Sequence, residues 1–73
     1  MNIGQNSFEV AQTLENLSSV YINMEDFTKA LEFSKKALEI KKLLTGTASI
    51  YVASTLKNIA VIYEKLNEED KAL

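Results

Sequence analysis

Apolar residues recur along two segments of the chain with the three- and four-residue spacing of one helix face. They are Val10, Leu14, Leu17 and Tyr21 in the first segment, and Val52, Leu56, Ile59 and Tyr63 in the second. Between them, residues 27–44 carry apolar side chains over a broad face, with lysine and glutamate filling the remainder. This periodicity predicts three α-helices and no strand.

The predicted helices are bounded by residues that favour helix ends. Small polar side chains at a helix start accept hydrogen bonds from free backbone N–H groups, and a glycine after the last turn readily adopts positive φ. The expected N-caps are Asn6 or Ser7 for the first helix, Asp26 for the second and Ser49 for the third, and the expected C-cap of the second helix is Gly46.

The two outer segments are copies of one unit. VAQTLENLSSVY starts at Val10, VASTLKNIAVIY starts 42 residues later at Val52, and six of the twelve positions are identical. Lys29-Ala30-Leu31 returns with the same offset at 71–73. We therefore predict an N-terminal tail at 1–6, a complete helix–turn–helix repeat at 7–48 and a second repeat at 49–73 that ends after its first helix. The acidic stretch 67–70 is predicted to form a turn that starts a fourth helix.

The order of residues within the unit resembles the tetratricopeptide repeat. The positions that carry the resemblance are Leu14, Leu17-Ser18, Tyr21, Glu25-Asp26-Phe27, Ala30 and Ala37. The 42-residue offset exceeds the roughly 34 residues of the common repeat and is similar to the kinesin-light-chain variety. The resemblance implies an all-α fold, in which antiparallel hairpins build a right-handed solenoid of about one and a half repeats. The family's turn glycine is replaced by Glu25 and Asn67.

The resemblance also implies a protein-binding scaffold that is part of a longer array of repeats and binds a peptide or protein in a concave groove, which is lined by the first helix of each unit. The groove residues carried over by position are Gln12, Glu15, Asn16, Ser19, Ile22 and Asn23, followed by Ser54, Lys57, Asn58, Val61, Glu64 and Lys65. Asn16 and Asn58 are the best candidates because a middling helix former recurs at one place in both units. Two interpretations stay open: each carboxamide clamps a peptide backbone, or it ties its helix to a neighbour in the stack.

An alternative function is self-association of a structural helical module, as a homodimer or by exchange of helices. We expect the apolar face of the third helix to lack a partner helix within the chain and therefore to seek another copy. The residues of this expected face are Val52, Leu56, Ile59, Ile62 and Tyr63.

Composition argues against other classes of function. The chain has no histidine and no cysteine, so the usual bases, nucleophiles and zinc ligands are missing, and we expect no catalysis, metal or cofactor. The net charge is −2 and every basic residue is a lysine, which opposes a nucleic-acid partner and an RNA-binding helical-hairpin array. No apolar run approaches a membrane span and no secretory signal starts the chain, so a cytoplasmic protein is expected.

Overall fold

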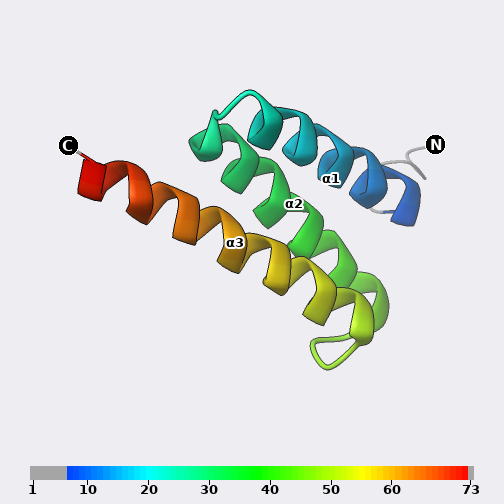
Figure 1. Cartoon of the computed structure of the whole chain (residues 1–73). Coiled ribbons are helices and arrows are strands. Elements are labelled where there is room, and N and C mark those ends of the chain that lie inside the picture. Colours follow the sequence, from blue (N-terminus) through cyan, green and yellow to red (C-terminus); the bar gives the residue numbers. More distant parts are fainter. Residues whose placement is uncertain (1–6, 73) are drawn as a thin grey trace.

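Three consecutive helices form the molecule, and the middle one is shared by the other two. The computed structural model describes the backbone of residues 7–72 and the side chains of residues 7–68. Helix α1 spans Phe8–Asn23, α2 spans Phe27–Thr45 and α3 spans Ile50–Ala72. Both α1 and α3 pack against α2, and each helix runs antiparallel to the one before it (Figure 1). The prediction of an all-α fold built from antiparallel hairpins is confirmed.

The helix starts lie at the predicted capping residues. The Ser7 and Asp26 side chains each accept a 3.3 Å hydrogen bond from the backbone N–H of the residue three positions later. Ser49 does the same at 3.1 Å for α3. Each bond satisfies one of the N–H groups that the first helical turn leaves free. Asn6, the alternative cap of α1, and the predicted tail at 1–6 lie outside the described residues.

The turn between α1 and α2 is a Schellman motif centred on Glu25. The N–H of Glu25 donates to the Ile22 carbonyl at 2.9 Å, and the N–H of Asp26 donates to the Tyr21 carbonyl at 2.8 Å. These two bonds require a left-handed residue, and Glu25 accordingly has φ 63°. A glutamate therefore holds a conformation that glycine adopts at much lower cost.

The second turn depends on the glycine predicted there. Gly46 has the expected positive φ of 85°, but its ψ of 167° gives an extended mirror-image conformation and not the left-handed helical one of the usual C-cap. Only glycine enters this region routinely because any Cβ clashes with its own backbone. The Thr45 and Ser49 hydroxyls meet across the turn at 2.6 Å.

Small residues let α1 and α2 approach closely. Ala11 and Ala37 are fully buried against each other and Ile40. Two turns further along, Ser18 donates to the Ala30 carbonyl at 2.9 Å, so the polar residue between the two helices also has a hydrogen-bond partner. Close packing of alanine and serine draws the two helices into one hairpin.

Packing of α3 against α2 corrects one prediction about self-association. Val52, Ile59 and Ile62 of the expected free face are buried, where they meet Leu38 or Phe27 of α2. The first helix of the second unit thus uses this face to join the units. Only Leu56 and Tyr63 of the expected face remain open, each with 48% of its surface exposed.

The predicted turn at 67–70 is wrong, because α3 continues without interruption to Ala72. In the first unit the chain turns back at Glu25, and Phe27 is then buried beneath α1 and α3. The position 42 residues after Phe27 is Glu69, a charged residue in place of the aromatic anchor. Without an apolar anchor after the acidic stretch, helical hydrogen bonding carries on through the segment.

Candidate functional site

A hollow of about 120 Å³ opens between α1 and α3, above the surface of α2. Its lining comes from all three helices. The residues are Glu15, Ser18, Ser19 and Ile22 from α1, Ser34 from α2, and Asn58 and Val61 from α3. Because α1 and α3 each pack mainly against α2, an open space remains between them.

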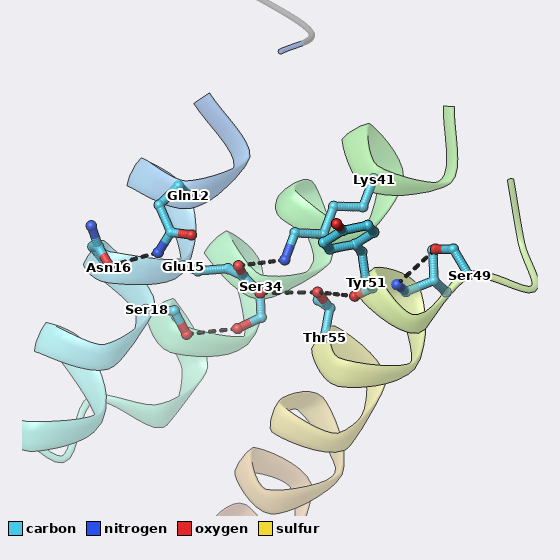
Figure 2. A network of polar contacts seen from close by, with 10 residues as sticks. Gln12, Glu15, Asn16, Ser18, Ser34, Lys41, Ser49, Tyr51 and Thr55 are labelled. Atoms are coloured by element: carbon cyan, nitrogen blue, oxygen red, sulfur yellow. Dashed lines mark hydrogen bonds and ion pairs between the residues drawn. The ribbon is translucent and has the colours of Figure 1, made fainter. Parts of the chain in front are cut away.

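Glu15 forms the most connected wall of this hollow (Figure 2). One carboxylate oxygen accepts from the Lys41 ammonium of α2 at 2.6 Å. The other accepts from the Thr55 hydroxyl of α3 at 2.9 Å. The two charged side chains are mostly buried, with 16% of Glu15 and 9% of Lys41 exposed, so their mutual neutralisation offsets the cost of removing them from water.

The floor of the hollow is a pair of buried hydroxyls (Figure 2). Ser18 and Ser34 lie 2.6 Å apart. Since the single Ser18 proton points to the Ala30 carbonyl, Ser34 is the donor of the bond between the two serines. The floor is therefore polar, but both hydroxyls already have hydrogen-bond partners within the chain.

The hollow contains some of the predicted groove residues and leaves out the rest. Glu15, Ser19, Ile22, Asn58 and Val61 line it. The predicted groove residues outside its lining are Gln12, Asn16, Asn23, Ser54, Lys57, Glu64 and Lys65, all of them exposed.

The two repeated asparagines differ in surroundings. Asn16 accepts a 3.2 Å bond from the Gln12 amide on the same helix, at the exposed edge of α1 (Figure 2). Asn58, its equivalent on α3, lines the hollow. Repetition in the sequence made them look alike, yet the α1 copy and the α3 copy face different neighbours.

Sequence reasoning missed Ser18, Ser34, Lys41 and Thr55 as parts of the site. For Thr55 a signal existed, because threonine recurs at positions 13 and 55 in the aligned units. Lys41 stood among other lysines that are exposed or half-buried. Only the three-dimensional packing of α2 distinguishes it from its neighbours.

Comparison with known proteins decides the family. The sequence matches the family described as tetratricopeptide repeat over residues 9–73. The chain belongs to the tetratricopeptide repeat family. Searches among curated proteins and among solved structures gave no match. Tetratricopeptide repeats generally mediate protein–protein interactions and typically act as scaffolds without catalytic activity.

The size of the hollow limits what this tetratricopeptide repeat chain can hold there. About 120 Å³ is well below the volume of pockets that enclose cofactors or drug-sized ligands, which start at roughly 300 Å³. Among the described residues, no three acidic side chains gather as a metal site would require. None of the described helices is both long and apolar enough to cross a membrane.

Proposed function

We propose that this chain is a protein-interaction module that binds a peptide segment of another protein in the hollow between α1 and α3. The observation that carries the proposal is the mixed lining of the hollow. Ile22 and Val61 offer apolar contact from opposite helices, while Asn58 and Ser19 offer exposed hydrogen-bonding groups beside them. Extended peptides combine apolar side chains with unpaired backbone groups and so match such a lining.

The volume of the hollow favours one small aliphatic side chain of the ligand. About 120 Å³ corresponds to roughly four water molecules of liquid volume. A valine or leucine of the ligand then packs between Ile22 and Val61. The Asn58 carboxamide, which carries both donors and an acceptor, pairs with the N–H and C=O of the adjacent ligand backbone.

Glu15 contributes shape to this proposed site more than charge. Its carboxylate already accepts from Lys41 and Thr55, so a basic ligand residue would have to compete with both. We therefore propose no strong selection for basic peptides at this wall. Dependence of binding on salt concentration should accordingly be weak.

The repeat is proposed to be of the kinesin-light-chain variety. Support comes from the 42-residue offset and from the 19 residues of α2, which lengthen the second helix of the unit. The alternative of self-association as the main function has less support, because three of the five side chains expected to drive it are buried against α2.

A displayed library of random peptides, selected against the full chain, tests the proposal, and two matched variants locate the binding site. Asn58→Ala should weaken a selected peptide by about tenfold, since a buried peptide bond would lose its partner. Asn16→Ala is the control, because it removes the same amide from the equivalent helix position outside the hollow. Helical circular dichroism should be unchanged in both variants.

The outcomes separate the site from its surroundings. Weakening confined to Asn58→Ala supports the hollow. Equal weakening by both variants would place the ligand along the exposed helix edges instead. Selection of no peptide at all, from a library that yields binders to other tetratricopeptide repeats, would reject a peptide-binding role.

A further inference from the structure

Two aromatic side chains meet across the space between α1 and α3. Phe8 at the start of α1 and Tyr51 at the start of α3 pack edge to face, with their ring centroids 5.1 Å apart. Neither residue is enclosed, because Phe8 keeps 43% and Tyr51 keeps 52% of its surface exposed. We call these two residues the aromatic pair. It presents aromatic surface that the packing of the three helices leaves uncovered.

The aromatic pair is in line with the hollow. On α1, Phe8, Glu15 and Ile22 follow one another at intervals of seven residues, which places them on one side of the helix. On α3, Tyr51 and Thr55 are four residues apart and so share a side as well. Glu15 and Ile22 line the hollow, and Thr55 donates to Glu15. A ligand that fills the hollow and continues toward the starts of α1 and α3 therefore meets the aromatic pair.

The polar groups between the hollow and the aromatic pair already have partners. The Glu15 carboxylate accepts from the Lys41 ammonium and from the Thr55 hydroxyl. A ligand gains little from such groups, because each new hydrogen bond replaces one that the chain makes itself. Contacts that select the ligand are thus concentrated at two places, the hollow and the aromatic pair.

The distance between these two places matches one spacing in an extended peptide. Ser19 and Asn58 of the hollow lie eleven residues after Phe8 and seven residues after Tyr51. At about 1.5 Å per helical residue these separations are roughly 16 Å and roughly 11 Å, with a mean of about 13 Å. In an extended peptide, residues i and i+4 point to the same side and lie about 13 Å apart.

We propose that the aromatic pair is a second anchor site of the peptide ligand, and that it binds an aliphatic side chain four residues away from the one in the hollow. This inference rests on the proposed function. An aliphatic side chain fits because it removes the exposed surface of both rings from water. The first turns of α1 and α3 lie here, and the positive ends of their dipoles disfavour a lysine or arginine of the ligand.

Displayed peptide libraries test the spacing with the full chain. Each library carries two leucines among random polar residues, placed at i and i+3, i+4, i+5 or i+6. The i+4 library should yield binders about fivefold tighter than the i+3 and i+5 libraries, in which the two leucines point to opposite sides of an extended peptide. In the i+6 library the second leucine falls about 7 Å beyond the aromatic pair, so its binders should be weaker too.

Matched variants assign the second leucine to the aromatic pair. Fluorescence anisotropy measures one synthetic i+4 peptide against the chain and its variants, each with its helical circular dichroism checked. Tyr51→Ala and Phe8→Ala should each weaken binding by about fivefold, because apolar contact is lost. Tyr63→Ala is the control, since it removes a tyrosine of similar exposure (48%) from α3 outside the hollow and the pair, and it should change binding less than twofold.

Changes in the peptide give the same information without altering the chain. Replacing either leucine by alanine should weaken binding to the unaltered chain by about fivefold. On the Tyr51→Ala chain, one of these two replacements should cost almost nothing further, because its contact is already lost, whereas the other should keep its full effect. Arginine in place of the leucine at the aromatic pair should bind more weakly than leucine.

The possible failures can be told apart. Binding that depends on Asn58 but not on the spacing of the leucines would overturn this inference and leave the proposed function standing. An i+4 preference that neither Tyr51→Ala nor Phe8→Ala weakens would place the second anchor elsewhere. Tighter binding with arginine would overturn the aliphatic assignment. Binders from none of the libraries would reject the proposed function and this inference together.

Discussion

Replacing Glu25 by glycine should stabilise the chain. Glu25 has φ 63° in the turn between α1 and α2, where its N–H and the next one close the Schellman hydrogen bonds. Glycine keeps both N–H donors and removes the Cβ that makes this conformation unfavourable. Because the Glu25 side chain is exposed, little packing is lost in the exchange.

Two opposing contributions set the size of the effect. A left-handed conformation costs an L-residue about 1–2 kcal/mol, and glycine avoids this cost. Glycine also makes the unfolded chain more flexible, which lowers the free energy of unfolding by about 0.4–1 kcal/mol. The net gain in the free energy of unfolding is about 0.5–1 kcal/mol, which for a chain of this size raises Tm by roughly 2–8 °C.

Thermal and urea unfolding followed by circular dichroism measure this gain. Glu25→Ala is the control for loss of the side chain. Because alanine keeps the Cβ that disfavours positive φ, this variant should leave Tm nearly unchanged. Glu32→Gly places the same glycine at an exposed position inside α2, where it should cost about 1 kcal/mol. If Glu25→Gly lowered Tm as Glu32→Gly does, the assignment of strain to Glu25 would be refuted.

Four further substitutions test other parts of the structure by the same unfolding measurements. Glu15→Ala should cost about 3 kcal/mol by leaving the buried Lys41 ammonium unpaired, and Lys41→Met should cost a comparable amount by leaving the mostly buried Glu15 carboxylate with only the Thr55 hydroxyl; a loss below about 1 kcal/mol in both variants would contradict the burial argument. Ser34→Ala should cost about 1 kcal/mol by removing the donor to Ser18, and no change would mean that water replaces it. Gly46→Ala should cost about 1–3 kcal/mol from backbone conformation alone, since no atom lies within 4 Å of the added Cβ; an unchanged Tm would show that the turn relaxes freely.

The helices and their starts could be predicted because their signals are local. Apolar spacing of three and four residues depends only on the geometry of one helix, and Ser7, Asp26 and Ser49 act within one turn of their own positions. The family followed from the internal repeat for the same reason. A pattern that occurs twice in one chain can be recognised without the tertiary structure.

The partners of each helix face could not be predicted in the same way. Val52 and Leu56 both belong to the apolar pattern of α3, yet Val52 is buried and Leu56 is exposed. Which side of a helix meets α2 depends on packing between the units, and the spacing of apolar residues along one helix does not reveal it. The error at 67–70 has a related cause, since an acidic stretch forms a turn only where an apolar anchor such as Phe27 follows.

The candidate site was predicted in part for the same physical reason. Position in the repeat assigned Asn58 and Val61 to the groove, and both line the hollow. It could not reveal that Ser34 forms the floor or that Lys41 neutralises Glu15, because both lie on the helix between the groove walls. Contacts across a shared middle helix arise only when the hairpin closes.

The Thr55 hydroxyl has a choice of two hydrogen-bond acceptors, one on each side of the space between α1 and α3. Its one proton has two acceptors within reach, Glu15 on α1 at 2.9 Å and the Tyr51 carbonyl on its own helix at 3.1 Å (Figure 2). If the bond to Glu15 breaks, the proton can turn to the Tyr51 carbonyl, so that no donor is left unpaired. We therefore expect the hydrogen bond between α1 and α3 to break at little cost, which would let the spacing of the two helices adjust to a peptide bound as proposed above.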